Sequence, residues 1–325
     1  MDLPLAVIRA VDSPPSWNQA RVLREVAHAR IAQTVIPPGP DGLCVFWTTA
    51  EQSPWLLRQI GRERELTFRA IGEGTGRTLD LDAFDQHYQH LCAWNVRRGE
   101  LVGAYRLRCI GASRPAMAAG SGAPDPGLYT QTLFRFDQEL LDRLGPAMEL
   151  GRAFVRAPYQ KAYAPLMLLW RGIGRMAAGF PGVRHLFGAA SIPSTHSPAA
   201  RALMLAYLRR YAFDDGLASL VSARRPPSES SQARGDAARL LPRCPQLHAL
   251  NEGVIALNPG GTPVPVLLRQ YLKLEARVLG FNVDPFFHDA IDALVVVDLQ
   301  RVPAALRHRF LAAPCVDCQS QLRSA

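Results

Sequence analysis

The 325-residue sequence contains no run of eighteen apolar residues, so no segment is expected to cross a bilayer. Its longest apolar stretch, residues 165–180, is interrupted by Arg171 and Arg175. No secretory signal precedes the six scattered cysteines, which are therefore expected to be reduced thiols. Cys315 and Cys318 lack the second pair that a zinc site needs, and no metal is expected. These absences favour a cytoplasmic protein, with peripheral association at the inner face of the cytoplasmic membrane as a second expectation.

Acidic residues are outnumbered: 37 Lys and Arg against 28 Asp and Glu give a net charge of +9. Such a balance favours an acidic partner, which includes nucleic acid, an anionic membrane or an acidic protein. No polybasic block is interleaved with aromatic residues, so nucleic acid is not the expected partner. The hydrophobic content of 48% allows a sizeable core in one large or two small domains.

The most informative segment is residues 148–165, which predict a strand, a loop and the start of an apolar helix. A helix N-terminus offers free backbone N–H groups to an anion, and Pro165 suits a first helical turn. Glu149 and Arg152 are three residues apart, so in a strand they face opposite sides unless a bulge intervenes. A buried ion pair between them that only closes a sheet is the structural alternative.

The elements expected around this segment alternate between helices and strands. Helices are expected at residues 17–34, 53–71, 166–176, from 197 and at 265–279, and strands at 90–94, 101–107, 148–155, 185–192 and 293–299. This order predicts an α/β protein with a mixed sheet. Residues 222–245 are rich in Ser, Arg and Pro without an apolar period, which predicts a mobile insert.

The run Glu-Leu-Gly-Arg-x-x-Val at residues 149–155, followed by Gln160 and an apolar helix, resembles a group of acyltransferases of the GNAT fold. These enzymes use acyl carrier protein, and they comprise the ornithine-lipid N-acyltransferases (hemolysin-like proteins) and, more distantly, the acyl-homoserine-lactone synthases. The resemblance covers about residues 53–298. It implies a GNAT-like mixed central sheet flanked by helices, with an N-terminal extension at 1–50, an acyltransferase domain at 51–300 with its insert at about 222–247, and a tail at 301–325.

Forming an amide from a thioester requires a base for the amine proton and a donor for the developing oxyanion. Glu149 is the expected base, positioned by Arg152. The resemblance places the oxyanion donor on this strand, at the backbone N–H of Phe154 or Val155. No covalent enzyme intermediate is expected, because the cysteines have no evident His partner.

The expected donor is acyl carrier protein. The usual GNAT phosphate loop has glycines where this sequence has Tyr163 and Pro165, so a close wrap around a coenzyme A pyrophosphate is disfavoured. The single phosphate of the carrier's phosphopantetheine arm needs fewer backbone amides, and no tightly bound cofactor is expected. The expected phosphate-binding residues are Gln160, Lys161, Ala162, Tyr163, Ala164 and Arg269.

An acidic segment before the first predicted strand resembles the acceptor side of the same families. Clustered carboxylates suit an acceptor with a cationic amine, such as ornithine, although aspartates in a turn also cap backbone amides. The expected substrate-binding residues are Arg64, Phe68, Asp80, Asp82, Asp85, His90, Ser191 and Lys273.

Three alternatives remain open: another amine acceptor, a signal-lactone-type product, or a non-catalytic protein that binds carrier protein or membrane. The His-x-x-x-x-Asp motif of glycerophospholipid O-acyltransferases is absent, because none of the eight histidines has Asp five residues on. If the protein binds an anionic membrane, the residues expected to contact it are the arginines of the insert: Arg224, Arg225, Arg234, Arg239 and Arg243.

Overall fold

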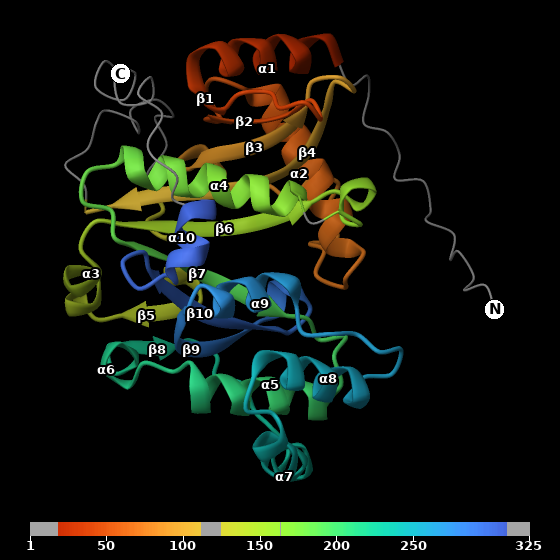
Figure 1. Ribbon diagram of the computed structural model, residues 1–325, viewed down its shortest axis with the longest axis vertical. Coiled ribbons are helices and arrows are strands. Elements are labelled where there is room, and N and C mark those ends of the chain that lie inside the picture. The colour runs from red at the N-terminus through yellow and green to blue at the C-terminus, as the bar shows by residue number, and fades with distance from the viewer. Residues whose placement is uncertain (1–18, 112–124, 163, 311–325) are drawn as a thin grey trace.

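The computed structural model describes residues 19–111, 125–162 and 164–310. An eight-stranded sheet of order β1-β2-β3-β4-β6-β7-β10-β9 runs through it, with helices on both sides (Figure 1). All neighbouring strands are antiparallel except β6 and β7, which are parallel. The mixed α/β sheet flanked by helices that the sequence predicts is therefore confirmed.

The strands of this sheet are short to medium in length. They are β1 (Thr34–Ile36), β2 (Leu43–Thr48), β3 (Gln89–Asn95), β4 (Glu100–Ile110), β6 (Ala147–Val155), β7 (His185–Ile192), β9 (Arg277–Asp284) and β10 (Ala290–Asp298). A separate two-stranded sheet pairs β5 (Phe134–Phe136) with β8 (Val221–Ala223). The α-helices are α1 (Gln19–Gln33), α2 (Pro54–Arg69), α3 (Gln138–Leu144), α4 (Ala164–Gly179), α5 (Pro198–Tyr211), α6 (Asp215–Ala218), α7 (Ser231–Leu240), α8 (Leu247–Leu257), α9 (Val266–Lys273) and α10 (Ala304–Phe310).

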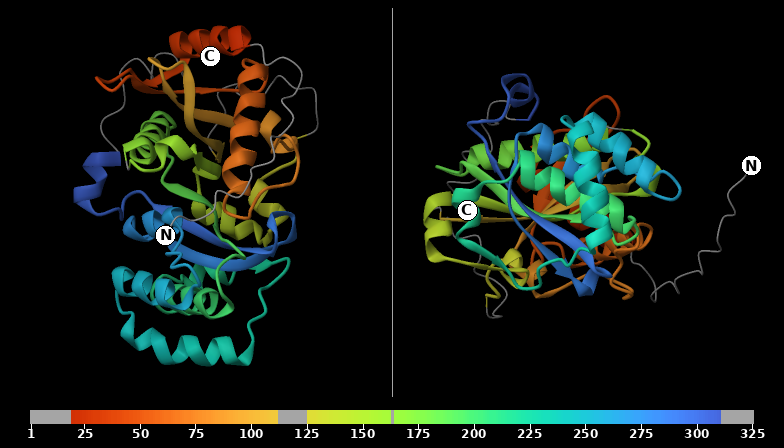
Figure 2. Two further views of the ribbon diagram at one scale, coloured as in Figure 1. Left: turned by 90° about the vertical axis from the view of Figure 1, so that its right-hand side faces the viewer. Right: turned by 90° about the horizontal axis from the view of Figure 1, so that it is seen from below.

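The two faces of the sheet are covered by different helices, because successive side chains of a strand point to opposite sides. Val45, Leu91 and Val102 enter the core beneath α4, whereas Phe46 and Cys92 pack beneath α1 and α2. The left view of Figure 2 shows α2 and α4 on opposite sides of the strands. At the far end of the molecule from α1, helices α5, α7 and α8 gather next to β9 (Figure 1). Among the described residues, no helix is both long and apolar enough to span a bilayer.

The centre of the sheet opens where β6 and β7 separate. Their parallel pairing runs from Ala147 and His185 to Leu150 and Gly188 and ends there. The other edge of β7 stays paired with β10 as far as Ile192. The last residues of β6 and β7 therefore present backbone groups to one another without a shared ladder, in the part of the sheet that leads into α4.

Three segments differ from the sequence-based expectation. The helix expected at residues 265–279 ends at Lys273, because the chain turns through Glu275 (φ 59°) and continues as β9. Residues 34–48, placed in an N-terminal extension, supply β1 and β2 of the main sheet. The segment expected as a mobile insert contains α7, which packs on α5 and buries Ala233 and Ala237. This helix was not predicted, because alanines four residues apart give a helix only a weakly hydrophobic face.

Candidate functional site

A β-bulge in β6 determines which side chains reach the opening. Ala104 of β4 faces Phe154, but Arg106 faces Gly151, so β6 carries one residue more than β4 between these pairs. Arg152 lies in this bulge with φ 50°, a left-handed conformation that is uncommon for residues other than glycine. The extra residue puts Arg152 on the same face of the sheet as Glu149.

Glu149 is buried and its carboxylate is saturated with hydrogen bonds. It accepts from the backbone N–H of Thr130 (2.8 Å), the Thr130 hydroxyl (2.6 Å), the Tyr88 hydroxyl and the backbone N–H of Tyr129 (3.3 Å). Tyr129 and Thr130 begin the 3₁₀-helix η2 (Tyr129–Thr132). Glu149 thus anchors η2 and Tyr88. The ion pair with Arg152, which was the structural alternative, is not formed, because each side chain has its own partners.

Arg152 faces the acidic segment after α2. Its guanidinium lies 3.2 Å from Asp82 and 3.4 Å from Asp80, and Nη1 donates to the Tyr129 hydroxyl at 3.1 Å. The guanidinium carbon (Cζ) of Arg152 lies 4.4 Å from the centroid of the Phe287 ring. Arg152 is thereby held between two carboxylates and two aromatic rings, with 10% of its side chain exposed.

The three aspartates expected to bind the acceptor all pair with arginines. Arg64 lies 2.9 Å from Asp80 and 3.0 Å from Asp85, and Arg106 lies 2.6 Å from Asp82 and 3.2 Å from Asp85. Burial alone would raise the pKa of Asp85, but the two guanidinium groups hold that pKa well below its usual range. Three aspartates balance Arg64, Arg106 and Arg152, so this cluster has no excess negative charge for a cationic ligand.

Two other expected substrate residues contribute to the same structure. The Nε2 atom of His90 donates to the backbone carbonyl of Asp85 at 2.9 Å, and burial lowers the pKa of His90. Phe68 meets Phe287 edge to face, with ring centroids 6.4 Å apart. Phe68 thus joins the end of α2 to the turn between β9 and β10.

Three buried carboxylates outside the expected site lie at the open end of the sheet: Glu73, Asp284 and Asp292. Burial raises the pKa of Glu73 to about 7, and it also raises the pKa values of Asp284 and Asp292. Ser191, an expected substrate residue, donates to Glu73 at 3.0 Å. The signal for Asp292 was present in the sequence, because it is a charge within the apolar run of residues 290–297.

The loop between β6 and α4 forms as expected. The N–H of Arg156 donates to the carbonyl of Val102 on β4 at 2.9 Å. Because N–H direction alternates along a strand, the N–H of Phe154 also points to β4, whereas the N–H of Val155 points toward the opening. Gln160 folds back and donates to the carbonyl of Val155 at 2.7 Å. Lys161 and Ala162 are exposed on this loop, and Ala164 is exposed at the start of α4. Tyr163 lies outside the described residues.

Arg269 and Lys273 belong to a different element from this loop. They lie on α9, which packs beside α4 through Tyr271 and Trp170, with ring centroids 5.2 Å apart. Between described residues, no hydrogen bond or ion pair joins Arg269 or Lys273 to residues 156–162. The expected phosphate-binding set is therefore divided between two elements on one face of the sheet.

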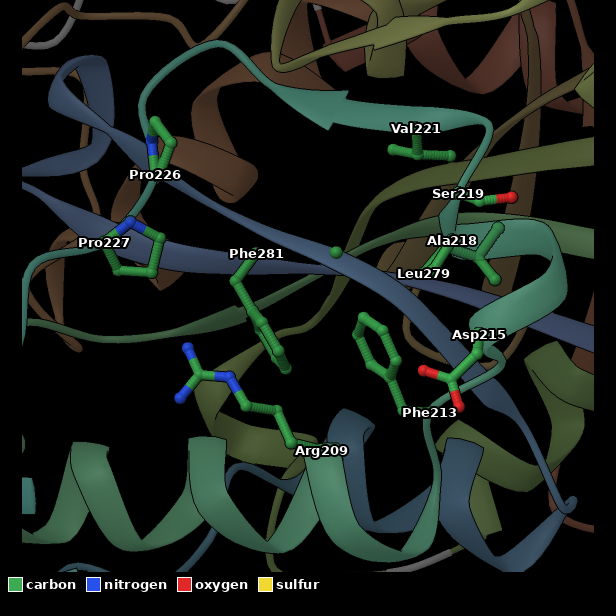
Figure 3. Close-up of a pocket in the computed structure, with 11 residues that line it drawn as sticks. Arg209, Phe213, Asp215, Ala218, Ser219, Val221, Pro226, Pro227, Leu279 and Phe281 are labelled. Carbon is green, nitrogen blue, oxygen red and sulfur yellow. The ribbon is translucent and has the colours of Figure 1, made fainter.

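A separate hollow of about 440 Å³ lies between β8, β9 and the end of α5 (Figure 3). Phe213 and Phe281 stack in it with centroids 6.2 Å apart, and the Arg209 guanidinium lies 5.2 Å from the Phe281 centroid. None of its lining residues belongs to the network around Glu149 and Arg152. The hollow is therefore not part of the candidate site.

A bulged central strand that separates from its parallel neighbour and leads into a helix N-terminus is the architecture of a GNAT acyltransferase. The family described as acetyltransferase (GNAT) domain accordingly matches this sequence at residues 64–170. The chain is 32% identical over 283 residues to the glycine N(alpha)-acyltransferase of Phocaeicola vulgatus, which covers 82% of this chain and 83% of that protein. The chain belongs to the acyltransferase family of this relative.

Two further similarities are more limited. The glycine N(alpha)-acyltransferase of Bacteroides thetaiotaomicron is 33% identical over 181 residues, so the chain spans about half of that relative (52%) with 53% of its own length. The structure of a CoA-dependent acyl-homoserine lactone synthase, BjaI, with SAM and isopentyl-CoA covers 87% of this chain and 100% of that chain. Its TM-score is 0.40 at 11% identity, which is too low to carry a functional argument.

Proposed function

We propose that the protein transfers a fatty acyl group from acyl carrier protein to the α-amine of an amino acid. The observation that carries the proposal is the end of β6–β7 pairing at Leu150 and Gly188, directly before the bulge at Arg152. Unpaired strand edges can hydrogen-bond an extended chain that contains amides, and a phosphopantetheine arm is such a chain. The opening therefore suits a thioester donor that lies between the two strands.

In this proposal, a backbone N–H of β6 stabilises the oxyanion that forms during the reaction. With the arm between β6 and β7, the thioester carbonyl lies on the side to which the N–H of Val155 points. That N–H is fixed by the strand before the reaction begins, which is what makes a preorganised donor effective. Phe154, the other expected donor, directs its N–H toward β4 and is assigned to packing with α2.

The preference for acyl carrier protein over coenzyme A rests on charge and on the loop. The chain has a net charge of +9, and Lys161 is exposed on a loop that has no glycine between residues 156 and 162. Arg98 lies beside the same loop, with its guanidinium 6.0 Å from the centroid of Tyr159. Carrier proteins are strongly acidic, so these cations would attract the carrier to the mouth of the opening.

The acceptor is an amino acid in this proposal, and two amino acids are the leading candidates. Ornithine follows from the resemblance of the central motif, and glycine follows from the names of the two relatives. In either case the product is an N-acyl amino acid, a lyso-lipid. Glu149 is assigned to holding Tyr88 and η2 in position beside the reacting groups, because its carboxylate is already occupied.

Donor competition tests this proposal. Purified protein receives equal concentrations of 3-hydroxyacyl carrier protein and the matching acyl coenzyme A, with glycine or ornithine, and products are followed by mass spectrometry. We expect the carrier protein to be the better donor at low salt, and its advantage to shrink near 0.5 M salt, where exposed charges are screened within about 4 Å. The variant K161E should reduce the carrier advantage. Equal rates with both donors at low salt would refute the carrier preference.

A further inference from the structure

The loop after α2 lies against the open ends of β7, β9 and β10. Ser191 of β7 donates to Glu73 of this loop at 3.0 Å, and at 2.9 Å the His288 ring donates from Nε2 to the carbonyl of Gly74. Figure 1 and the left view of Figure 2 both show this loop meeting the β9–β10 turn. On β10, Asp292 lies opposite Ser191 on one side and Asn282 on the other. Glu73, Asp292 and Asp284, which ends β9, are thus brought together.

These three carboxylates are buried, with exposures of 4% for Glu73, 2% for Asp284 and 7% for Asp292. Among the described residues, the side-chain carboxylate of Asp292 makes no hydrogen bond or ion pair, and one oxygen of Glu73 (Oε1) is buried without a partner. Asp284 accepts from the backbone N–H of Phe286 at 2.9 Å and from the Tyr129 hydroxyl at 3.4 Å. An unpaired buried polar group is costly, so a ligand that supplies hydrogen-bond donors would stabilise this cluster.

No cation in the described structure is paired with these carboxylates. Arg152 is close enough to act on all three, but its ion pairs are with Asp80 and Asp82. Arg225 acts on Asp284 from an exposed position and forms no ion pair with it. The neighbouring cluster of three aspartates is matched by three arginines, whereas this cluster has three carboxylates and no arginine of its own.

The cluster also adjoins the reaction centre. The Tyr129 hydroxyl accepts from Arg152 and donates to Asp284, which joins the bulge of β6 to the end of β9. Ser191 lies on the stretch of β7 that no longer pairs with β6. A small ligand held by Glu73 and Asp292 is therefore on the β7 side of the opening in which the donor would lie.

We propose that Glu73, Asp284 and Asp292 bind the cationic amine of the acceptor, and that Glu73 receives its proton. This inference rests on the proposed function. The bound ammonium gives one proton to the Glu73 carboxylate, and the free amine attacks the thioester carbonyl carbon. The C–S bond then breaks with its electron pair leaving on sulfur, and the thiolate takes the second proton from nitrogen. The products are the amide and the carrier thiol, and Glu73 returns its proton to solvent.

Steady-state kinetics of Asp292→Asn test the binding role, because the carboxamide keeps the shape and removes the charge. We expect the KM for the amine to rise at least tenfold while the KM for the acyl donor stays within twofold. Asp298→Asn is the matched control on the same strand, since Asp298 pairs with Arg184 at the opposite end of β10. An unchanged amine KM in Asp292→Asn would overturn the inference and leave the proposed acyl transfer standing.

Calorimetry without a donor separates the inference from the proposed function. Glycine and L-ornithine are titrated into the wild-type protein and compared with glycolate, in which a hydroxyl replaces the ammonium. We expect at least one amine to bind ten times more tightly than glycolate, and Asp292→Asn to lose that preference. Amine binding without acyl transfer would retain the inference and refute the proposed function. Glycolate binding as tightly as both amines, or no amine binding, would refute the inference.

The proton-accepting role has its own variant. Glu73→Gln should lower kcat by about 10²–10⁴, the usual share of general-base catalysis, and should remove the rise of kcat with pH near neutrality. The groups that face Glu73 are Ser191, Arg152, Asp284 and Asp292. A variant that keeps wild-type kcat and pH profile would show that Glu73 accepts no proton.

Discussion

Glu149 and Arg152 of β6 lie on one face of the sheet and are joined through a single residue, Tyr129. The backbone N–H of Tyr129 faces the Glu149 carboxylate at 3.3 Å, and its hydroxyl accepts from Arg152 at 3.1 Å. The bulge at Arg152 makes this possible, because without it two residues three apart would face opposite sides. The charged residues of the central motif are thus two ends of a polar network, with η2 between them.

The saturated carboxylate of Glu149 predicts a stability effect. Glu149→Gln puts an NH₂ donor where one of the Tyr88, Tyr129 and Thr130 donors now points. We expect the free energy of unfolding to fall by about 1–3 kcal/mol, the cost of leaving a buried donor unsatisfied. Urea denaturation measures this change.

The same variant separates the two roles that Glu149 could have. A general base that does not support the fold would give a variant of wild-type stability whose rate falls by about 10²–10⁴. Thr130→Val is the matched control, since it removes one hydroxyl donor and leaves the carboxylate in place. If Glu149→Gln is as stable as wild type, the positioning role is wrong.

More of the fold than of the site could be predicted from the sequence. The strand-loop-helix at residues 147–179 has a strong apolar pattern and a helix-starting Pro165, so its elements were evident. β1 and β5 have three residues each, too few to show a period of two. They could not be recognised without their partners.

The candidate site was predicted only in part, for a physical reason. Sequence spacing places Asp80, Asp82 and Asp85 together but does not show that Arg106, on another strand, neutralises two of them. Conversely, Glu73 and Asp292 are 219 positions apart in the chain and meet only because β10 pairs with β7. Charge balance in a buried cluster depends on such long-range contacts, so it becomes visible only in the folded chain.

Glu73 also predicts how stability depends on pH. Its folded pKa of about 7 lies above the ordinary value of 4.5, so the folded protein binds more protons than the unfolded chain between these values. The contribution of Glu73 to stability is full below pH 4.5 and is lost as the pH rises through 7. The free energy of unfolding should therefore fall with pH more steeply in wild type than in Glu73→Gln, by on the order of 2–3 kcal/mol between pH 4.5 and 7.5. Parallel curves for the two proteins would contradict this assignment.

Asp85 predicts the opposite dependence of stability on pH. Arg64 and Arg106 lower its folded pKa, so its contribution is full above the ordinary carboxyl pKa and is lost as the pH falls. Asp85→Asn leaves two buried arginines underpaired and should cost about 3–5 kcal/mol at pH 7. Asp125→Asn is the control, because Asp125 pairs with Arg108 at the surface, where a pair contributes about 1 kcal/mol or less. Thermal melts of equal Tm for the two variants would refute the structural role of the buried cluster.

The arginines of α7 and the turn after it, in the segment expected as a mobile insert, predict a weak association with anionic membranes. Arg234, Arg239 and Arg243 are exposed on α7 and the turn after it. Each cation near an anionic surface contributes about 1 kcal/mol, so changing all three to Glu should reduce flotation with phosphatidylserine vesicles at least tenfold. The matched control changes Arg24, Arg135 and Arg143, which are exposed elsewhere, to Glu. Equal losses in both triple variants would assign the effect to net charge and not to α7.

The most direct test of acyl transfer uses acyl carrier protein loaded with a 3-hydroxy fatty acid and an acceptor labelled with ¹⁵N at its α-amine. The acceptors are glycine and ornithine in separate reactions, and tandem mass spectrometry locates the acyl group in each product. We predict an N-acyl amino acid in which the acyl carbonyl is bonded to the labelled nitrogen, formed together with free carrier thiol. Release of only the free fatty acid, or intact acyl carrier protein with both amines, would contradict the account.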